Sequence, residues 1–120
     1  MSKPKILLAE DDFTMVSLLT TLLKMEGYDV VSLNADDDVL TGVRTHMPDV
    51  LILDVHLFSQ SGLEILKHLR ESADIRGLRV LMSSGANVRE ECMNTGADGF
   101  LLKPYMPDDL FKLLRQVIAA

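Results

Sequence analysis

The sequence predicts an α/β fold: a doubly wound, five-stranded parallel sheet with helices on both faces. Two observations predict it. Five short apolar runs alternate strictly with longer segments of helical spacing, and each run is apolar at consecutive positions. Consecutive apolar positions are typical of strands that helices cover on both faces. Five βα units in succession require right-handed crossovers, so we expect the strand order 2-1-3-4-5.

The expected strands are runs of four to six residues, far shorter than the ~20 apolar residues of a membrane-spanning helix. They are Lys5–Ala9, Tyr28–Leu33, Val50–Leu53, Arg79–Ser83 and Gly99–Leu102. A basic N-terminus precedes the first run, but acidic residues end that run at once, so no export signal is predicted.

The first two helices have clear end signals. Apolar residues at helical spacing predict a helix over Phe13–Glu26, and Gly27 then stands where a left-handed residue ends a helix. The second helix is expected from about Asp36 to Thr45, with Pro48 as its stop.

The remaining three helices follow the central strands. Ser61 and Glu64 form a capping-box pattern that predicts the start of the third helix. The fourth, about Val88–Asn94, is short and ends before Gly96, and the fifth runs from Pro107 to the C-terminus. No linker or repeat interrupts the pattern, so we expect one domain over residues 1–120.

Composition narrows the class of protein. A net charge of −6 and a pI of about 4.9 argue against direct nucleic-acid binding, which requires a basic face. The single Cys92 cannot form an internal disulfide and fits a reducing compartment. We therefore expect a cytoplasmic protein that has neither nucleic acid nor membrane as a direct partner.

Polar side chains follow four of the five strands, and the carboxyl ends of parallel strands share one edge of the sheet, where ligands bind. They are Glu10-Asp11-Asp12 after the first, Asp54 after the third, Ser83-Ser84-Gly85 after the fourth and Lys103-Pro104 after the fifth. Local structure explains some of them, since Asp12 suits a helix N-cap and Asp54 alone suits a turn. Helix capping does not explain why Asp54 and Lys103 share that edge.

The cluster indicates a particular chemistry. Three neighbouring carboxylates repel one another unless a cation neutralises them, and hard oxygen ligands favour Mg²⁺. A lysine is not a metal ligand, so Lys103 suggests that an additional anion visits the site. A carboxylate nucleophile, a divalent metal and a cation are what aspartyl-phosphate formation needs.

The chain resembles a response-regulator receiver domain of two-component signalling, which has a flavodoxin-like fold, over essentially all 120 residues. The residues that carry the resemblance are Glu10-Asp11, Asp54, Ser84-Gly85 and Lys103-Pro104. The resemblance implies a signalling switch rather than an enzyme, limited to self-phosphorylation from a donor and loss of its own phosphoryl group. The donor would be a histidine kinase or a histidine phosphotransfer protein.

The resemblance also implies a role for each matching position. Asp54 would accept the phosphoryl group and would hold Mg²⁺ together with Asp11. Glu10 would act partly through water, and the backbone carbonyl of His56 would complete the protein ligands. The side chain of His56 either borders the site or points to solvent.

The phosphoryl-binding and switch positions follow from the same resemblance. Ser84 and Lys103 would hold phosphoryl oxygens, with the Gly85 amide assisting. Ser83 is the alternative hydroxyl, because it ends the same strand. Phe100 stands at the aromatic switch position, although a ring packed in the core in every state would also explain it.

Other functions remain to be distinguished. The output is expected at the face of helix four, strand five and helix five, toward a partner or a missing effector domain, although the fourth helix is shortened here. A degenerate receiver that binds partners without phosphorylation is the alternative. Phosphatases that form an aspartyl-phosphate place their nucleophile after strand one in an Asp-x-Asp pattern, and Glu10-Asp11-Asp12-Phe13 does not fit that pattern, so this function is disfavoured. A nucleotide-binding domain is disfavoured because it would need a Gly-rich or Ser/Thr-rich loop after strand one, and this loop is acidic.

Overall fold

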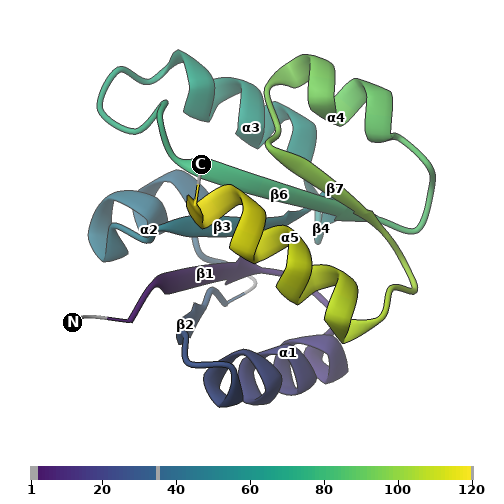
Figure 1. Ribbon diagram of the computed structural model, residues 1–120. Helices are drawn as coiled ribbons and strands as arrows, with labels where there is room; N and C mark the ends of the chain where they lie inside the picture. The colour runs from purple at the N-terminus through teal and green to yellow at the C-terminus, as the bar shows by residue number, and fades with distance from the viewer. Residues whose placement is uncertain (1–2, 35, 120) are drawn as a thin grey trace.

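The computed structural model describes residues 3–34 and 36–119. A parallel sheet of five strands runs through its centre in the order β2-β1-β3-β6-β7 (Figure 1). These strands are β1 (Lys5–Ala9), β2 (Asp29–Ser32), β3 (Val50–Asp54), β6 (Arg79–Ser84) and β7 (Gly99–Leu102). Because β6 and β7 are the fourth and fifth parallel strands in the chain, the predicted order 2-1-3-4-5 is confirmed.

Helices cover both faces of the sheet, as Figure 1 shows. The helices are α1 (Phe13–Met25), α2 (Val39–His46), α3 (Gly62–Glu71), α4 (Arg89–Thr95) and α5 (Pro107–Ala119). Buried residues of α1 and α5 pack in one hydrophobic cluster, and those of α2, α3 and α4 pack in a second. The sheet therefore separates two cores.

Successive residues of the central strands alternate between these two cores. In β3, Leu51 belongs to the α2–α3–α4 core and Ile52 to the α1–α5 core. Each buried side chain contributes roughly 1.5–3 kcal/mol, so both faces of the strand stabilise the fold. This double burial is the physical reason for apolar residues at consecutive positions.

Side-chain caps set the ends of the helices. Asp12 accepts hydrogen bonds from the backbone N–H of Thr14 (2.9 Å) and Met15 (3.2 Å) at the start of α1. Ser61 accepts one from the Glu64 N–H (3.3 Å) at the start of α3. Gly27 follows α1 with a φ of 95°, in the left-handed region that the sequence predicts.

The second helix begins three residues later than expected. The sequence predicts a start near Asp36, but α2 starts at Val39. Asp38 is the cap, because its carboxylate accepts from the N–H (2.9 Å) and the hydroxyl (2.7 Å) of Thr41. The carboxylate of Asp37 instead accepts from the N–H of Asn34 at 2.8 Å and takes no part in the cap of α2.

A short hairpin after β3 was not predicted. It consists of β4 (His56–Leu57) and β5 (Gln60–Ser61), which pair antiparallel, with Phe58 between them at a φ of 53°. Two-residue strands carry no periodicity, so the sequence pattern does not reveal them. The hairpin lies directly after Asp54 and therefore borders the carboxyl edge of the sheet.

Candidate functional site

Three carboxylates come together at the carboxyl edge of the sheet. Glu10 follows β1, Asp11 is the next residue, and Asp54 ends β3. One oxygen of each lies within 4.8 Å of one oxygen of the others. Glu10 and Asp54 are only 5% and 6% exposed, whereas Asp11 is exposed. Two charges of the same sign are therefore held largely out of water.

Lys103 neutralises the two buried acids. Its Nζ lies 2.7 Å from Glu10 Oε2 and 2.9 Å from Asp54 Oδ2, so one ammonium group bridges both carboxylates. The backbone N–H of Lys103 donates to the carbonyl of Ser84 at 2.8 Å, which fixes the loop after β7 against the end of β6. The peptide bond between Lys103 and Pro104 is cis.

Burial dominates the titration of Glu10. Burial raises its pKa to about 7; the hydrogen bonds from Lys103 and from the Asp12 backbone lower the pKa without cancelling that effect, and the Asp54 charge raises it further. Burial by itself would lower the pKa of Lys103, but its hydrogen bonds to Glu10 and Asp54 outweigh burial and raise it. Lys103 therefore stays cationic, and the site favours additional positive charge.

Backbone amides orient the acids. Glu10 Oε1 accepts from the N–H groups of Asp11 (3.1 Å) and Asp12 (3.2 Å). Glu10 is thereby held by its own loop on one oxygen and by Lys103 on the other. A carboxylate fixed in this way presents its free lone pairs in a defined direction.

The β4–β5 hairpin contributes two further amides. The N–H of His56 donates to Asp54 Oδ1 at 3.3 Å, and the N–H of Phe58 donates to Asp11 Oδ2 at 3.2 Å. The hairpin thus donates one hydrogen bond to Asp54, at the end of β3, and one to Asp11, in the loop after β1. The side chain of His56 is exposed. Phe58 is a residue of this edge that the sequence argument missed, because only its backbone takes part.

The hydroxyl and aromatic candidates lie on β6 and β7. Ser83 and Ser84 are both 1% exposed; Ser83 pairs with Asp54 in the sheet register, and Ser84 Oγ accepts from the Ala86 N–H at 3.1 Å. Gly85 is exposed, and a Cβ atom at this position would have no neighbour within 4 Å. Phe100 is 7% exposed and packs in the α2–α3–α4 core.

The donor set fits a hard divalent cation. All three side-chain ligands are carboxylate oxygens, they converge within one small region, and Asp11 leaves an open side toward solvent. Mg²⁺ prefers such ligands and usually keeps several waters. The residues present are therefore compatible with Mg²⁺ held by Glu10, Asp11 and Asp54.

The family comparison identifies the fold and the class of protein together. The family model described as "Response regulator receiver domain" matches residues 6–115. The chain belongs to this family. Receiver domains are signalling switches rather than classical enzymes. The resemblance expected from the strand-end residues is thereby confirmed.

Curated relatives of this receiver domain are transcriptional regulators by name. It is 28% identical over 118 residues to "Probable transcriptional regulator ycf27" of Porphyridium aerugineum, covering 98% of this chain and 49% of that protein. It is 28% identical over 116 residues to "DNA-binding response regulator MtrA" of Mycobacterium tuberculosis, covering 94% and 50%. The chain spans about half the length of these relatives.

Solved structures share the whole domain. The chemotaxis response regulator CheY4 of Vibrio cholerae is 26% identical, with a TM-score of 0.87 and coverage of 97% of this chain and 99% of that chain. A CheY-like receiver domain protein of Methanospirillum hungatei is 24% identical, with a TM-score of 0.86 over 98% and 95%. The latter likeness concerns the fold alone.

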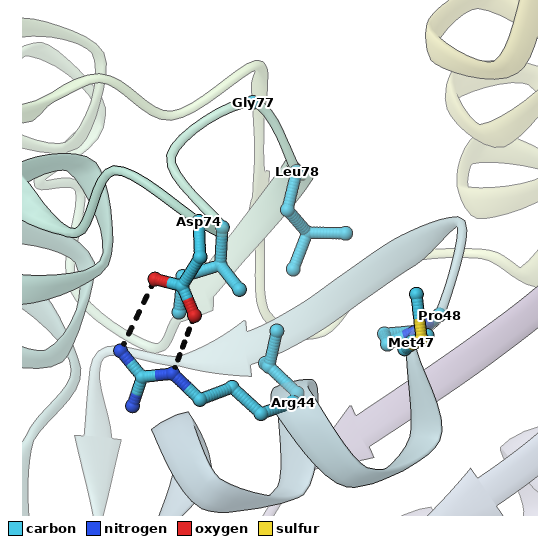
Figure 2. A pocket seen from close by; sticks show the side chains of 8 residues that line it. Arg44, Met47, Pro48, Asp74, Gly77 and Leu78 are labelled. Carbon is cyan, nitrogen blue, oxygen red and sulfur yellow. Dashed lines mark hydrogen bonds and ion pairs between the residues drawn. The ribbon is translucent and has the colours of Figure 1, made fainter.

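Two cavities lie at opposite edges of the sheet. One of about 470 Å³ lies before β3 and β6, where Figure 2 shows the Arg44–Asp74 ion pair on one side of the cavity and Met47 and Pro48 on the other. The other, of about 370 Å³, adjoins the acidic site. Its lining residues are Asp12, Met15, Lys103, Pro104 and Tyr105. No helix among residues 3–34 and 36–119 is long and apolar enough to span a membrane.

Proposed function

We propose that this receiver domain accepts a phosphoryl group on Asp54 from a phosphohistidine of a histidine kinase or histidine phosphotransfer protein. The observation that carries the proposal is the buried Asp54 carboxylate bridged by Lys103 to Glu10, with Asp11 alongside. A structural ion pair would need only one acid for one lysine. An excess of carboxylates around a fixed lysine supports a site that binds both a cation and an anion.

Each residue has a defined task in this proposal. Asp54 attacks the phosphorus atom; its oxygen forms the new P–O bond while the P–N bond to the histidine of the donor breaks, and the bonding electrons leave with the imidazole nitrogen. Glu10, Asp11, Asp54 and the backbone carbonyl of His56 would hold Mg²⁺. Bound Mg²⁺ supplies positive charge opposite the phosphoryl oxygens.

The residues around Asp54 would then hold the product. Lys103 turns from the carboxylates to a phosphoryl oxygen, Ser84 donates its hydroxyl to another, and the Gly85 amide assists. The added charge of about −1.5 to −2 biases the face formed by α4, β7 and α5 toward a second conformation, with Phe100 as the switch residue. An output partner or effector domain then binds that face. We propose that the reaction takes place in the cytoplasm.

Intact mass spectrometry tests the proposal. The protein is incubated with a small-molecule phosphodonor, with Mg²⁺ and with a chelator. We expect one added phosphoryl group that depends on the metal and is absent from Asp54→Asn, because an amide is nearly isosteric with the carboxylate but a poor nucleophile. Asp29→Asn, at an exposed position of the edge strand β2, is the matched control and keeps the adduct.

Two outcomes would contradict phosphoryl acceptance at this site. A metal-independent adduct that persists in Asp54→Asn would place the modification elsewhere. The absence of any adduct, together with no binding of the phosphoryl mimic beryllofluoride, would favour a degenerate receiver that binds its partners without phosphorylation. Fast hydrolysis alone would leave beryllofluoride binding intact, so the two measurements separate these cases.

A further inference from the structure

Asp11 is the least constrained of the three carboxylates at the acidic edge. Glu10 and Asp54 are buried and are bridged by Lys103, whereas Asp11 is exposed. An exposed carboxylate can rotate into solvent, and it then loses that freedom when it binds a cation. The contact that restrains Asp11 in the folded protein therefore influences how tightly this edge holds a metal ion.

The backbone N–H of Phe58 restrains Asp11. It donates to Asp11 Oδ2 at 3.2 Å, between residues 47 positions apart in the sequence. While this bond is made, one oxygen of Asp11 lies within 4.8 Å of an oxygen of Glu10 and of Asp54. A carboxylate offers about four lone-pair sites, so the bond leaves acceptor capacity for a cation. The N–H thus holds Asp11 beside the other two acids.

Phe58 adopts a backbone conformation that is unusual for its residue type. Its φ is 53°, in the left-handed region, where bulky residues are rarely found. Phe58 and Ser59 form the two-residue loop between Leu57 and Gln60, which pair in the hairpin. Such loops usually have Gly at a first central position with positive φ. The strained residue is therefore also the one whose N–H reaches Asp11.

The same hairpin also holds Asp54. The N–H of His56 donates to Asp54 Oδ1 at 3.3 Å, and β4 begins two residues after Asp54. Residues 54–58 thus link two of the three acids by one short segment of chain, through one amide at each. The turn at Phe58 fixes the place of Asp11 relative to Asp54 because the hairpin follows Asp54 so closely.

We propose that Phe58 is a positioning residue whose backbone N–H holds Asp11 in the orientation that binds Mg²⁺. This inference rests on the proposed function, because it concerns the metal on which phosphoryl acceptance depends. The N–H donates to Asp11 and has no assigned contact with the phosphoryl group. It therefore sets the concentration of Mg²⁺ that the site requires and leaves the rate of phosphoryl transfer at saturating Mg²⁺ unchanged.

An amide-to-ester replacement at Phe58 removes this N–H alone. The α-hydroxy analogue of phenylalanine at position 58 keeps the ring and the course of the chain but puts an ester oxygen in place of the N–H. In calorimetric titration we expect half-saturation to require about tenfold more Mg²⁺, as is typical when a group that orients a metal ligand is lost. The same replacement at Ser59 is the matched control. It alters the same loop but keeps the Phe58 N–H, so its Mg²⁺ requirement should stay unchanged.

The dependence of phosphoryl uptake on Mg²⁺ separates positioning from support of the fold. For the Phe58 ester we expect the half-maximal rate to require more Mg²⁺, by the same factor as in calorimetry, and the rate at saturating Mg²⁺ to equal that of the unmodified protein. A lower rate at saturation with an unchanged Mg²⁺ requirement would show a structural role and overturn the proposal.

Phe58→Gly separates the N–H from the ring. The variant keeps the N–H, removes the ring and places at this position the residue that best tolerates a positive φ. We therefore expect its Mg²⁺ affinity to match that of the unmodified protein. A loss of affinity as large as that of the ester would assign the effect to the ring and would overturn the proposal.

The hydrogen bond is also measurable without metal. In the NMR spectrum of the metal-free protein, we expect the amide proton of Phe58 to move upfield in Asp11→Ala, because that variant removes the acceptor. Asp108→Ala, at an exposed position of α5, is the control for loss of a negative charge and should leave this resonance in place. An unchanged Phe58 resonance in Asp11→Ala would overturn the proposal.

Mass spectrometry of the Asp54 adduct keeps the role of Phe58 apart from phosphoryl acceptance. A metal-dependent adduct together with a raised Mg²⁺ requirement in the Phe58 ester supports both. The same adduct with an unchanged Mg²⁺ requirement overturns the role of Phe58 and leaves phosphoryl acceptance standing. Absence of both Mg²⁺ binding and the adduct from the unmodified chain overturns the proposed function and this inference with it.

Discussion

Lys103 balances the negative charge of Glu10 and Asp54. Its ammonium group is the bridge between Glu10 and Asp54, both of which are almost fully buried. Removing it leaves two acids facing each other without their shared counter-charge. The demand for another cation at this edge then rises, because like charges in a poorly solvated region repel strongly.

Lys103→Ala tests this balance. We expect Mg²⁺ binding to be retained, since none of the carboxylates is changed, and the phosphorylation-dependent response of the α4–β7–α5 face to be lost. Calorimetric titration measures the first and hydrogen exchange in β7 the second. Lys112→Ala, at an exposed position of α5, serves as the control for loss of a positive charge. A response of normal size in Lys103→Ala would contradict the assigned role.

Gly62 allows the start of α3 to pack closely against the backbone of Asp54 and Val55. It is the first residue of α3, and its N–H donates to the Val55 carbonyl at 2.6 Å. A Cβ atom at this position would collide with the carbonyl oxygen of Asp54 and would lie 2.9 Å from Val55 Cα. These neighbours are backbone atoms, which have little room to move.

Gly62→Ala should therefore destabilise the fold and disturb the site. We expect a loss of about 2–3 kcal/mol in urea unfolding and a slower rate of phosphoryl uptake, because relief of the clash displaces Asp54. Gly77→Ala is the matched control, since nothing lies within 4 Å of a Cβ there. Equal stability of the two variants would contradict this prediction, because it would show that α3 can move away from β3 at little cost in free energy.

At the scale of single elements, the start of α2 depends on an ionised cap. Asp38 accepts from both the side chain and the backbone of Thr41, and these two bonds, the side-chain bond first, lower its pKa from the ordinary value. A carboxylate with a folded-state pKa below its unfolded-state pKa stabilises the protein above the unfolded value. That stabilisation is lost as the pH falls through the lowered pKa.

The α2 cap predicts a specific pH dependence. Asn is also a good N-cap but does not titrate, so Asp38→Asn should be slightly less stable than the unmodified protein at neutral pH. The difference should disappear as the pH falls through the lowered pKa of Asp38, where its carboxylate becomes protonated. Thermal unfolding of both proteins across this range measures it. A difference that stays constant with pH would mean that the charge of Asp38 contributes nothing.

At the scale of the whole molecule, Arg70 joins segments far apart in the chain. From α3, its guanidinium group donates to the carbonyls of Gly96 (2.9 Å), Arg76 (2.7 Å) and Leu78 (2.5 Å), and it pairs with Asp98 at 3.0 Å. The C-terminal end of α4, the loop before β6 and the loop before β7 are thereby held to one side chain. The half-buried position of Arg70 makes these bonds costly to lose.

Arg70→Lys tests this connection. The variant keeps the charge, but one ammonium nitrogen cannot replace the three guanidinium nitrogens that reach four separate partners, so we expect a loss of about 2–3 kcal/mol in urea unfolding. Arg44→Ala provides the contrast, because Arg44 pairs with Asp74 at 2.9 Å on the exposed surface and should change stability little. If both variants lose the same free energy of unfolding, the contacts of Arg70 contribute no more to stability than a surface ion pair does.

Much of this receiver domain follows from sequence pattern alone. Consecutive apolar residues in β1 and β3 report burial on both faces, and that requires a sheet between two helical layers. The order of the strands is the one common in flavodoxin-like doubly wound sheets, with right-handed βαβ crossovers. Polar residues directly after strands then converge at one edge, so the proximity of Asp54 to Lys103, 49 residues later, was predictable.

The particular partners of each side chain required the tertiary structure. Nothing in the sequence indicates that Lys103 bridges Glu10 as well as Asp54, that Arg70 joins the loop before β6 to the loop before β7, or that the Tyr105 hydroxyl makes no hydrogen bond. Periodicity reports which face of an element is buried, because burial repeats along the chain. Hydrogen bonds between distant segments depend on the angles at which packed elements meet, and those angles are decided only when the two cores close around the sheet.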